Sequence, residues 1–86
     1  MGRKTWDVNI DGEHHAVLAR WSPWTAAGEI LVDGKAVDLW GPRVWLGLRR
    51  FKVSGEPAFL RWPSTISQKC ELFVDGVKVG ARAPKA

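Results

Sequence analysis

The stretch Glu29-Ile30-Leu31-Val32-Asp33-Gly34-Lys35-Ala36-Val37-Asp38-Leu39 contains two short apolar runs joined by Asp-Gly. This pattern predicts a β-hairpin, because Asp-Gly between alternating apolar residues suits the type I′ turn, whose twist matches that of the strands. Such a turn requires positive φ at both central residues, and Gly34 adopts that conformation without steric cost. Counting cross-strand partners outward from a two-residue loop places Val32 opposite Lys35 and Ile30 opposite Val37.

The same signal occurs three more times along the chain. Its glycines are Gly12, Gly34, Gly55 and Gly76, at intervals of 22, 21 and 21 residues. We therefore predict four consecutive hairpins whose turn residues are Asp11, Gly12, Asp33, Gly34, Ser54, Gly55, Asp75 and Gly76. Outside the second hairpin, the expected strands are Thr5 to Ile10, Glu13 to Arg20, Leu48 to Val53, Glu56 to Arg61, Cys70 to Val74 and Val77 to Val79.

Alternation along these strands predicts one inner face. The residues expected on it are Trp6, Val8, Ile10, Val17, Ala19, Ile30, Val32, Val37, Leu39, Phe51, Val53, Ala58, Leu60, Leu72, Val74, Val77 and Val79. Eight short strands with one apolar face must pack as two sheets or close into a barrel, and we favour an all-β antiparallel sandwich. The expected organisation is a loose basic segment 1–4, one domain over 5–80 and a flexible tail 81–86.

Length, amino-acid composition and net charge limit the class of protein to which the chain can belong. The 86 residues suffice for one small domain, and 45% hydrophobic with 26% charged residues is typical of a folded soluble chain. A single Cys cannot form an internal disulfide, and no signal peptide or membrane-spanning apolar run is evident, so we expect a cytoplasmic protein without membrane contact. The formal net charge of +4 allows an acidic partner without identifying one.

The turn motifs and the apolar residues beside them also resemble those of a known protein family. Over roughly residues 5–80 the chain resembles the Fas apoptosis inhibitory molecule family, in the frames Trp6-x-Val8-x-Ile10-Asp11-Gly12-Glu13, Gly28-Glu29-Ile30-x-Val32-Asp33-Gly34-Lys35, Phe51-x-Val53 and Leu72-x-Val74-Asp75-Gly76. The resemblance implies a compact antiparallel β-sandwich. Animal members are associated with protein binding, death-receptor signalling and protection of other proteins from aggregation, so it also implies a binding module without a catalytic site.

A search for catalytic chemistry finds no motif. His14 and His15 are adjacent on a strand and point to opposite faces, so they cannot ligate one metal together, and His15 is expected to be partly buried and hydrogen-bonded. Cys70 is expected to fill a small apolar space. No phosphate loop, nucleophile elbow or zinc-protease motif occurs, so we predict a non-enzymatic protein with no cofactor and no metal. One alternative for the turn carboxylates is an acidic edge that attracts a cation.

Arg and Trp neighbour one another where two strands run into loops. The candidate binding residues are Arg20, Trp21, Trp24, Arg61 and Trp62, whereas Trp6 is expected in the core. Our first hypothesis is contact with a protein partner or a homodimer through these exposed aromatics. The alternatives are stacking of single-stranded nucleic acid on an Arg/Trp surface and stacking of carbohydrate on exposed Trp. A structural role, in which Trp closes the core and Arg lies on its edge, remains open at this point.

Overall fold

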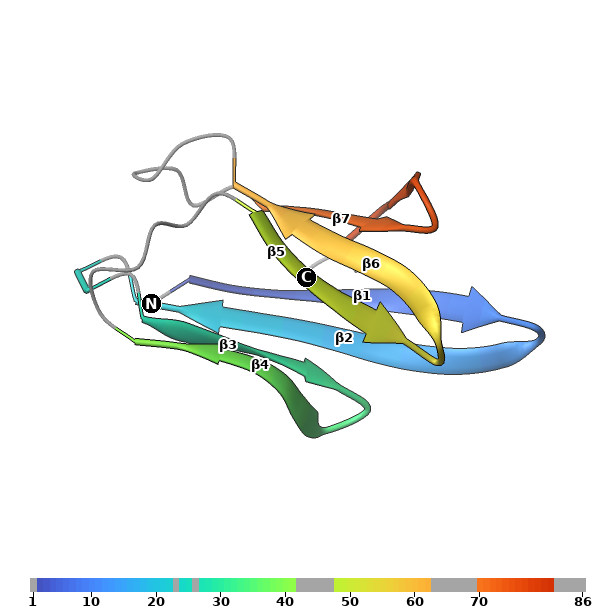
Figure 1. The fold of residues 1–86 in the computed structure, drawn as a ribbon, viewed down its shortest axis with the longest axis horizontal. Helices are drawn as coiled ribbons and strands as arrows, with labels where there is room; N and C mark the ends of the chain where they lie inside the picture. Colours follow the sequence, from blue (N-terminus) through green and yellow to red (C-terminus); the bar gives the residue numbers. More distant parts are fainter. Residues whose placement is uncertain (1, 23, 26, 42–47, 63–69, 82–86) are drawn as a thin grey trace, which may run out of the picture.

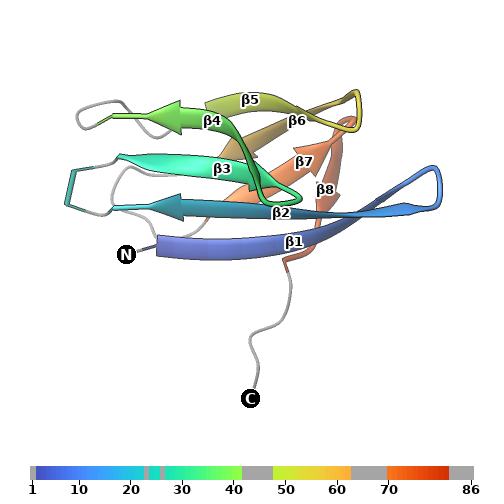
Figure 2. The same cartoon turned by 90° about the horizontal axis from the view of Figure 1, so that it is seen from below.

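The computed structural model describes residues 2–22, 24–25, 27–41, 48–62 and 70–81. The described chain is all-β and forms two antiparallel four-stranded sheets, in the orders β1-β2-β3-β4 and β5-β6-β7-β8 (Figures 1 and 2). The strands are β1 (Gly2–Ile10), β2 (Glu13–Trp21), β3 (Gly28–Val32), β4 (Lys35–Trp40), β5 (Leu48–Val53), β6 (Glu56–Arg61), β7 (Glu71–Val74) and β8 (Val77–Val79). The predicted antiparallel sandwich of four consecutive hairpins is confirmed.

All four hairpin turns have the predicted geometry. Asp11, Asp33, Ser54 and Asp75 have φ of 51°, 52°, 49° and 50°, and the glycine after each has φ between 79° and 84°. Two successive residues in the left-handed region are what a type I′ turn requires. These turns join β1 to β2, β3 to β4, β5 to β6 and β7 to β8, and all four lie at one end of the molecule (Figure 1).

The core lies between the two sheets and contains most of the residues predicted for it. The pairs Ile10–Glu13, Val8–His15 and Trp6–Val17 form in the register that a two-residue loop sets, which turns Trp6, Val8 and Val17 inward. From the second sheet, the predicted residues Phe51, Val53, Ala58, Leu60, Leu72 and Val74 are all buried. Ile10 and Val79 are half-buried and pack against this core.

The chain start differs from the prediction. Residues 2–4 belong to β1, with Gly2 paired to Trp21 at the end of β2, so the prediction of a loose basic segment is wrong for them. This pairing requires glycine at position 2, because Gly2 lies against the Trp21 ring and any Cβ there would overlap the indole. In the expected tail, Ala81 forms an isolated antiparallel bridge with Trp6, and 82–86 fall outside the described residues.

The second hairpin departs from the predicted register. Ile30 pairs with Asp38 and Leu31 with Ala36, so Val37 is left without a partner in the ladder and forms a bulge. One extra residue reverses the faces of the strand beyond it, and Leu39 is 66% exposed while Trp40 is buried. The predicted inward positions of Val37 and Leu39 are therefore wrong. Val77 is also exposed, since it lies on the three-residue edge strand β8.

Polar contacts join the two sheets at both sides. Arg49 on β5 donates from Nε and from a terminal nitrogen to the two carboxylate oxygens of Asp38 on β4, at 2.8 and 2.9 Å. The same guanidinium lies 4.9 Å from the centroid of the Trp40 ring. On the other side, Lys4 Nζ donates to the carbonyl oxygen of Cys70 at 2.9 Å. These contacts close the sandwich without a continuous barrel ladder.

A further contact fastens the second hairpin to β2. The Asp33 carboxylate accepts a hydrogen bond from the Ala16 N–H at 2.9 Å and lies 2.7 Å from His15 Nδ1. His15 is thus partly buried and hydrogen-bonded, as predicted. Both contacts favour the ionised carboxylate, and they lower the pKa of Asp33 below its ordinary value near 3.8, the His15 bond being the larger cause.

Trp6→Ala should nearly abolish folding. The buried indole packs between the sheets, and its removal leaves a cavity that costs about 3 to 5 kcal/mol, a large share of the stability of a small domain. Chemical denaturation followed by circular dichroism measures this loss, with Trp24→Ala as the exposed control. A cooperative transition displaced by less than about 1 kcal/mol would contradict the placement of Trp6.

Asp33→Asn should lower stability at neutral pH and have little effect in acid. The folded state holds the pKa of Asp33 below the unfolded value, so the carboxylate stabilises the fold above that unfolded value, and this contribution disappears as the pH falls through the folded pKa. Melting temperatures of both proteins, measured from neutral pH down to about pH 2, should therefore converge. Asp11→Asn, at the equivalent turn position, is the control. An equal fall in melting temperature in both variants would mean that the change in the turn, and not the loss of the His15 contact, lowers the stability.

Candidate binding surface

The five residues predicted for the binding surface separate into two groups. Trp21 is 2% and Trp62 3% exposed, so both are core residues and the prediction that they lie on the surface is wrong. Trp24 is 93% exposed. Arg61 is exposed on β6, and Arg20 is half-buried on β2, where a terminal guanidinium nitrogen donates to the Glu29 carboxylate.

Trp21 and Trp62 are buried because they pack together across the two sheets. Their ring centroids are 5.5 Å apart at an interplanar angle of 85°, and Trp62 meets Trp40 in the same edge-to-face manner at 5.8 Å and 73°. Three indoles in this geometry combine a large buried area with favourable ring electrostatics. They close the core at the end opposite the turns, which is the structural role that the sequence left open.

The loop that carries Trp24 is held by hydrogen bonds of residues before and after Trp24 in the chain. Ser22 N–H donates to the Ala27 carbonyl at 2.8 Å, which joins the two ends of the loop. Ser22 Oγ accepts from the N–H groups of Trp24 and Thr25 at 3.3 and 3.4 Å, and Thr25 Oγ1 accepts from the Ala27 N–H at 3.3 Å. Hydrogen bonds thus hold the backbone at Trp24, and its side chain projects into solvent.

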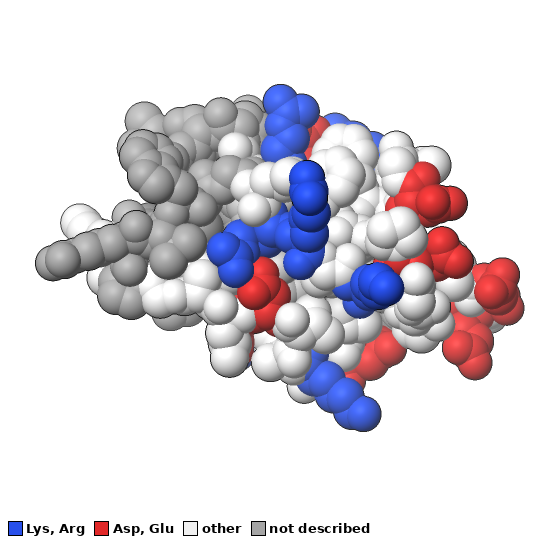
Figure 3. Space-filling view, viewed as in Figure 1, with Lys and Arg blue, Asp and Glu red and all other residues white. Residues whose placement is uncertain are grey.

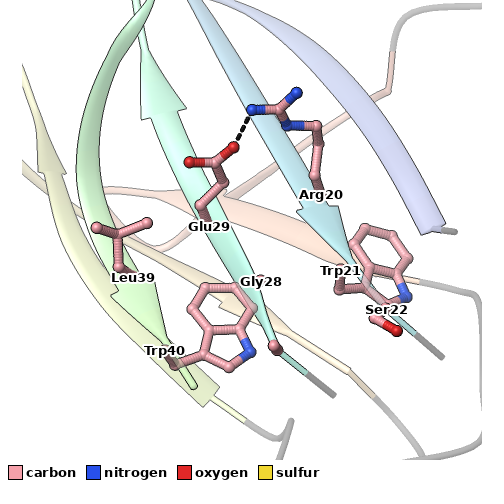
Figure 4. Close-up of a pocket in the computed structure, with 8 residues that line it drawn as sticks. Arg20, Trp21, Ser22, Gly28, Glu29, Leu39 and Trp40 are labelled. Carbon is pink, nitrogen blue, oxygen red and sulfur yellow. Dashed lines mark hydrogen bonds and ion pairs between the residues drawn. The ribbon is translucent and has the colours of Figure 1, made fainter. Parts of the chain in front are cut away.

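An open, mainly apolar groove of about 340 Å³ lies at the base of this loop (Figure 4). Its lining residues are Arg20, Trp21, Ser22, Ala27, Gly28, Glu29, Leu39 and Trp40. Gly28 is required here, because a Cβ would lie 2.6 Å from the Trp40 ring. Figure 4 shows the paired Arg20 and Glu29 side chains together on neighbouring strands, with Leu39 and Trp40 on β4. The groove thus has an apolar floor with an ion pair on its margin.

Sequence reasoning missed Leu39 and Trp40 as members of this surface. Both follow the bulge at Val37, and simple alternation from the turn assigns Leu39 to the core. The sequence carried one usable signal, the small residue Gly28 at the start of a strand, since a glycine there indicates close approach of another group. That signal does not identify the approaching ring.

The surroundings of the cysteine, histidine and carboxylate side chains indicate structural roles for them. Cys70 is buried, as predicted, and burial raises the pKa of its thiol to about 12, so it stays protonated at neutral pH. His14 Nε2 lies 2.7 Å from an Asp7 carboxylate oxygen on the adjacent strand. Figure 3 shows that acidic side chains gather at the turn end. Within the described ranges, no three His, Cys, Asp or Glu side chains converge in a way that could hold a metal ion.

Comparison of the chain with protein-family models, curated proteins and solved structures found no match. In the part of the chain that the structure describes, no helix has the length and hydropathy needed to cross a bilayer.

Proposed function

We propose that the protein is a non-enzymatic binding module that acts through protein–protein contacts, with Trp24 as the anchor of the contact surface. The observation that carries this proposal is an almost fully exposed indole on a hydrogen-bonded loop. Trp is the residue most enriched among those that dominate binding energy in protein interfaces, because it buries a large rigid surface with little loss of side-chain freedom.

The surroundings of Trp24 support the same role. The groove at the base of its loop has an apolar floor, and exposed Leu39 and Val37 extend apolar surface along β4. The Arg20–Glu29 pair adds polar groups at the margin, as is usual for the rim of an interface. A partner side chain inserted in the groove could contact Leu39 while Trp24 packs against the same partner. The partner is another protein or a second copy of this chain.

Two alternatives lose two of the three Trp rings on which they depended, and of these Trp24 alone is exposed. Stacking of carbohydrate or of nucleic-acid bases on an Arg/Trp surface requires exposed rings, and Trp21 and Trp62 are buried. The resemblance to the Fas apoptosis inhibitory molecule family stays a prediction. It is compatible with a protein-binding module of sandwich fold.

Trp24→Ala should weaken partner binding without destabilising the fold. The exposed indole contributes almost no buried area to the free protein, so the melting temperature should change little, whereas loss of an interface anchor costs about 2 kcal/mol or more, roughly 30-fold in affinity. Sedimentation velocity over a concentration series tests self-association. Quantitative affinity capture with immobilised wild-type and variant protein tests heterologous partners.

Val77→Ala is the matched control, since Val77 is another exposed apolar residue but lies on β8. Partners or dimers retained by wild-type protein and the Val77 variant, and lost by the Trp24 variant, would support the proposal. Equal retention by all three proteins would remove Trp24 from the contact surface. A large fall in melting temperature would make Trp24 a packing residue.

A further inference from the structure

The outward face of the second sheet carries an aromatic pair between basic residues. Register places Arg50 opposite Phe59, Phe59 opposite Phe73 and Phe73 opposite Lys78, so these four side chains form one row across β5, β6, β7 and β8. Both sequence neighbours of Phe59 and both of Phe73 are buried, so these two rings face away from the core. We call these four residues, with Lys52 and Arg61, the basic-aromatic face.

Phe59 and Phe73 are stacked at the centre of this face. Their ring centroids are 4.8 Å apart with an interplanar angle of 15°. This separation equals the spacing of adjacent strands, so the rings stand up from the sheet beside each other. Both are half-buried, which leaves ring surface open to a ligand. Because the rings face each other, a planar ligand can stack only on the outer face of either ring, and it can do so without rearrangement of the core.

The charges around the pair are almost all positive. Arg50, Lys52, Arg61 and Lys78 are exposed, and Glu71 is the one carboxylate on the described strands of this face. Glu71 is already engaged, because its Oε2 lies 2.9 Å from Lys78 Nζ. That contact lowers the pKa of Glu71, with a smaller contribution from Arg61. Figure 3 shows basic side chains over the region where Figure 1 draws β5, and acidic ones at the turn end.

We propose that the basic-aromatic face binds single-stranded nucleic acid, with bases stacked on Phe59 and Phe73 and phosphates held by Arg50, Lys52 and Arg61. Single strands are bound in this way elsewhere, by a basic surface that follows the backbone and by aromatic rings that accept any base. This face is distinct from the Trp24 surface and does not depend on the proposed protein contact.

The geometry favours a single strand over a duplex. Stacked bases in a duplex hide their faces from a flat sheet, whereas unpaired bases can reach the exposed Phe rings. Phosphates alone would be satisfied by Arg50, Lys52 and Arg61 without any aromatic group. The position of the Phe pair beside these three cations matches a ligand that is both planar and anionic.

The test uses fluorescence anisotropy with labelled mixed-sequence oligonucleotides of about 12 nucleotides, as single-stranded DNA, single-stranded RNA and duplex DNA. Wild-type protein should bind both single strands more tightly than duplex. With three cations neutralising phosphates, affinity should fall roughly 40-fold between about 50 and 300 mM salt. A preference between DNA and RNA would identify which strand the face selects.

Paired variants separate stacking from charge. Phe59→Leu and Phe73→Leu retain apolar volume, and each should weaken single-strand binding about tenfold with an unchanged salt slope. Arg50→Ala should weaken binding and reduce the magnitude of the salt slope by about 0.7. Arg3→Ala makes the same change in net charge on β1, in the first sheet, and should leave affinity within about twofold. Melting temperatures confirm that each variant is folded.

Several outcomes would overturn the proposal. Absence of binding at low salt, duplex binding as tight as single-strand binding, or unchanged affinity in both Phe variants would each exclude stacking on this face. Equal losses for Arg3→Ala and Arg50→Ala would show attraction by net charge only. Amide shift mapping gives an independent readout, because ligand-induced shifts must fall on β5 to β8 and not on the first sheet.

Discussion

The two-residue turn is the constraint from which the rest of the structure follows. A connection this short between antiparallel strands favours the type I′ and II′ conformations, and all four turns here have Asp or Ser followed by Gly, both at positive φ as type I′ requires. Each turn then fixes which residues pair, and pairing fixes which side chains face the core. Four such turns on one chain of 86 residues assemble two sheets, whose inner faces have no alternative but to pack on each other.

Prediction from the sequence succeeded where the turn directly sets the register of a strand pair. The register of β1 with β2 and of β5 with β6 follows from counting outward from Gly12 and Gly55, and the inner faces follow from register. It failed at Val37, where one unpaired residue reverses the remainder of β4. Nothing in the local sequence marks that bulge, and beyond it Trp40 packs over Gly28, its partner on the neighbouring strand.

The candidate surface was harder to predict than the fold. A Trp beside an Arg at the end of a strand looks the same in sequence whether its ring closes the core or projects from a loop. Trp21 and Trp62 are buried because the two sheets bring them within 5.5 Å of each other, which is a tertiary fact. Trp24 was correctly expected to be exposed. The Phe59–Phe73 pair escaped notice because alternation alone assigns both rings to an outward face without showing that they adjoin.

The shared location of the turns has a consequence for how this molecule meets charged partners. On the face drawn in Figure 3, acidic side chains concentrate at the turn end while basic ones lie over β5, so this face carries separated charges. The electric field of a polyanion exerts a torque on these separated charges and turns the acidic end away before contact. Encounters are thus oriented in advance, and their rate, as distinct from the final affinity, depends on the ionic strength of the medium.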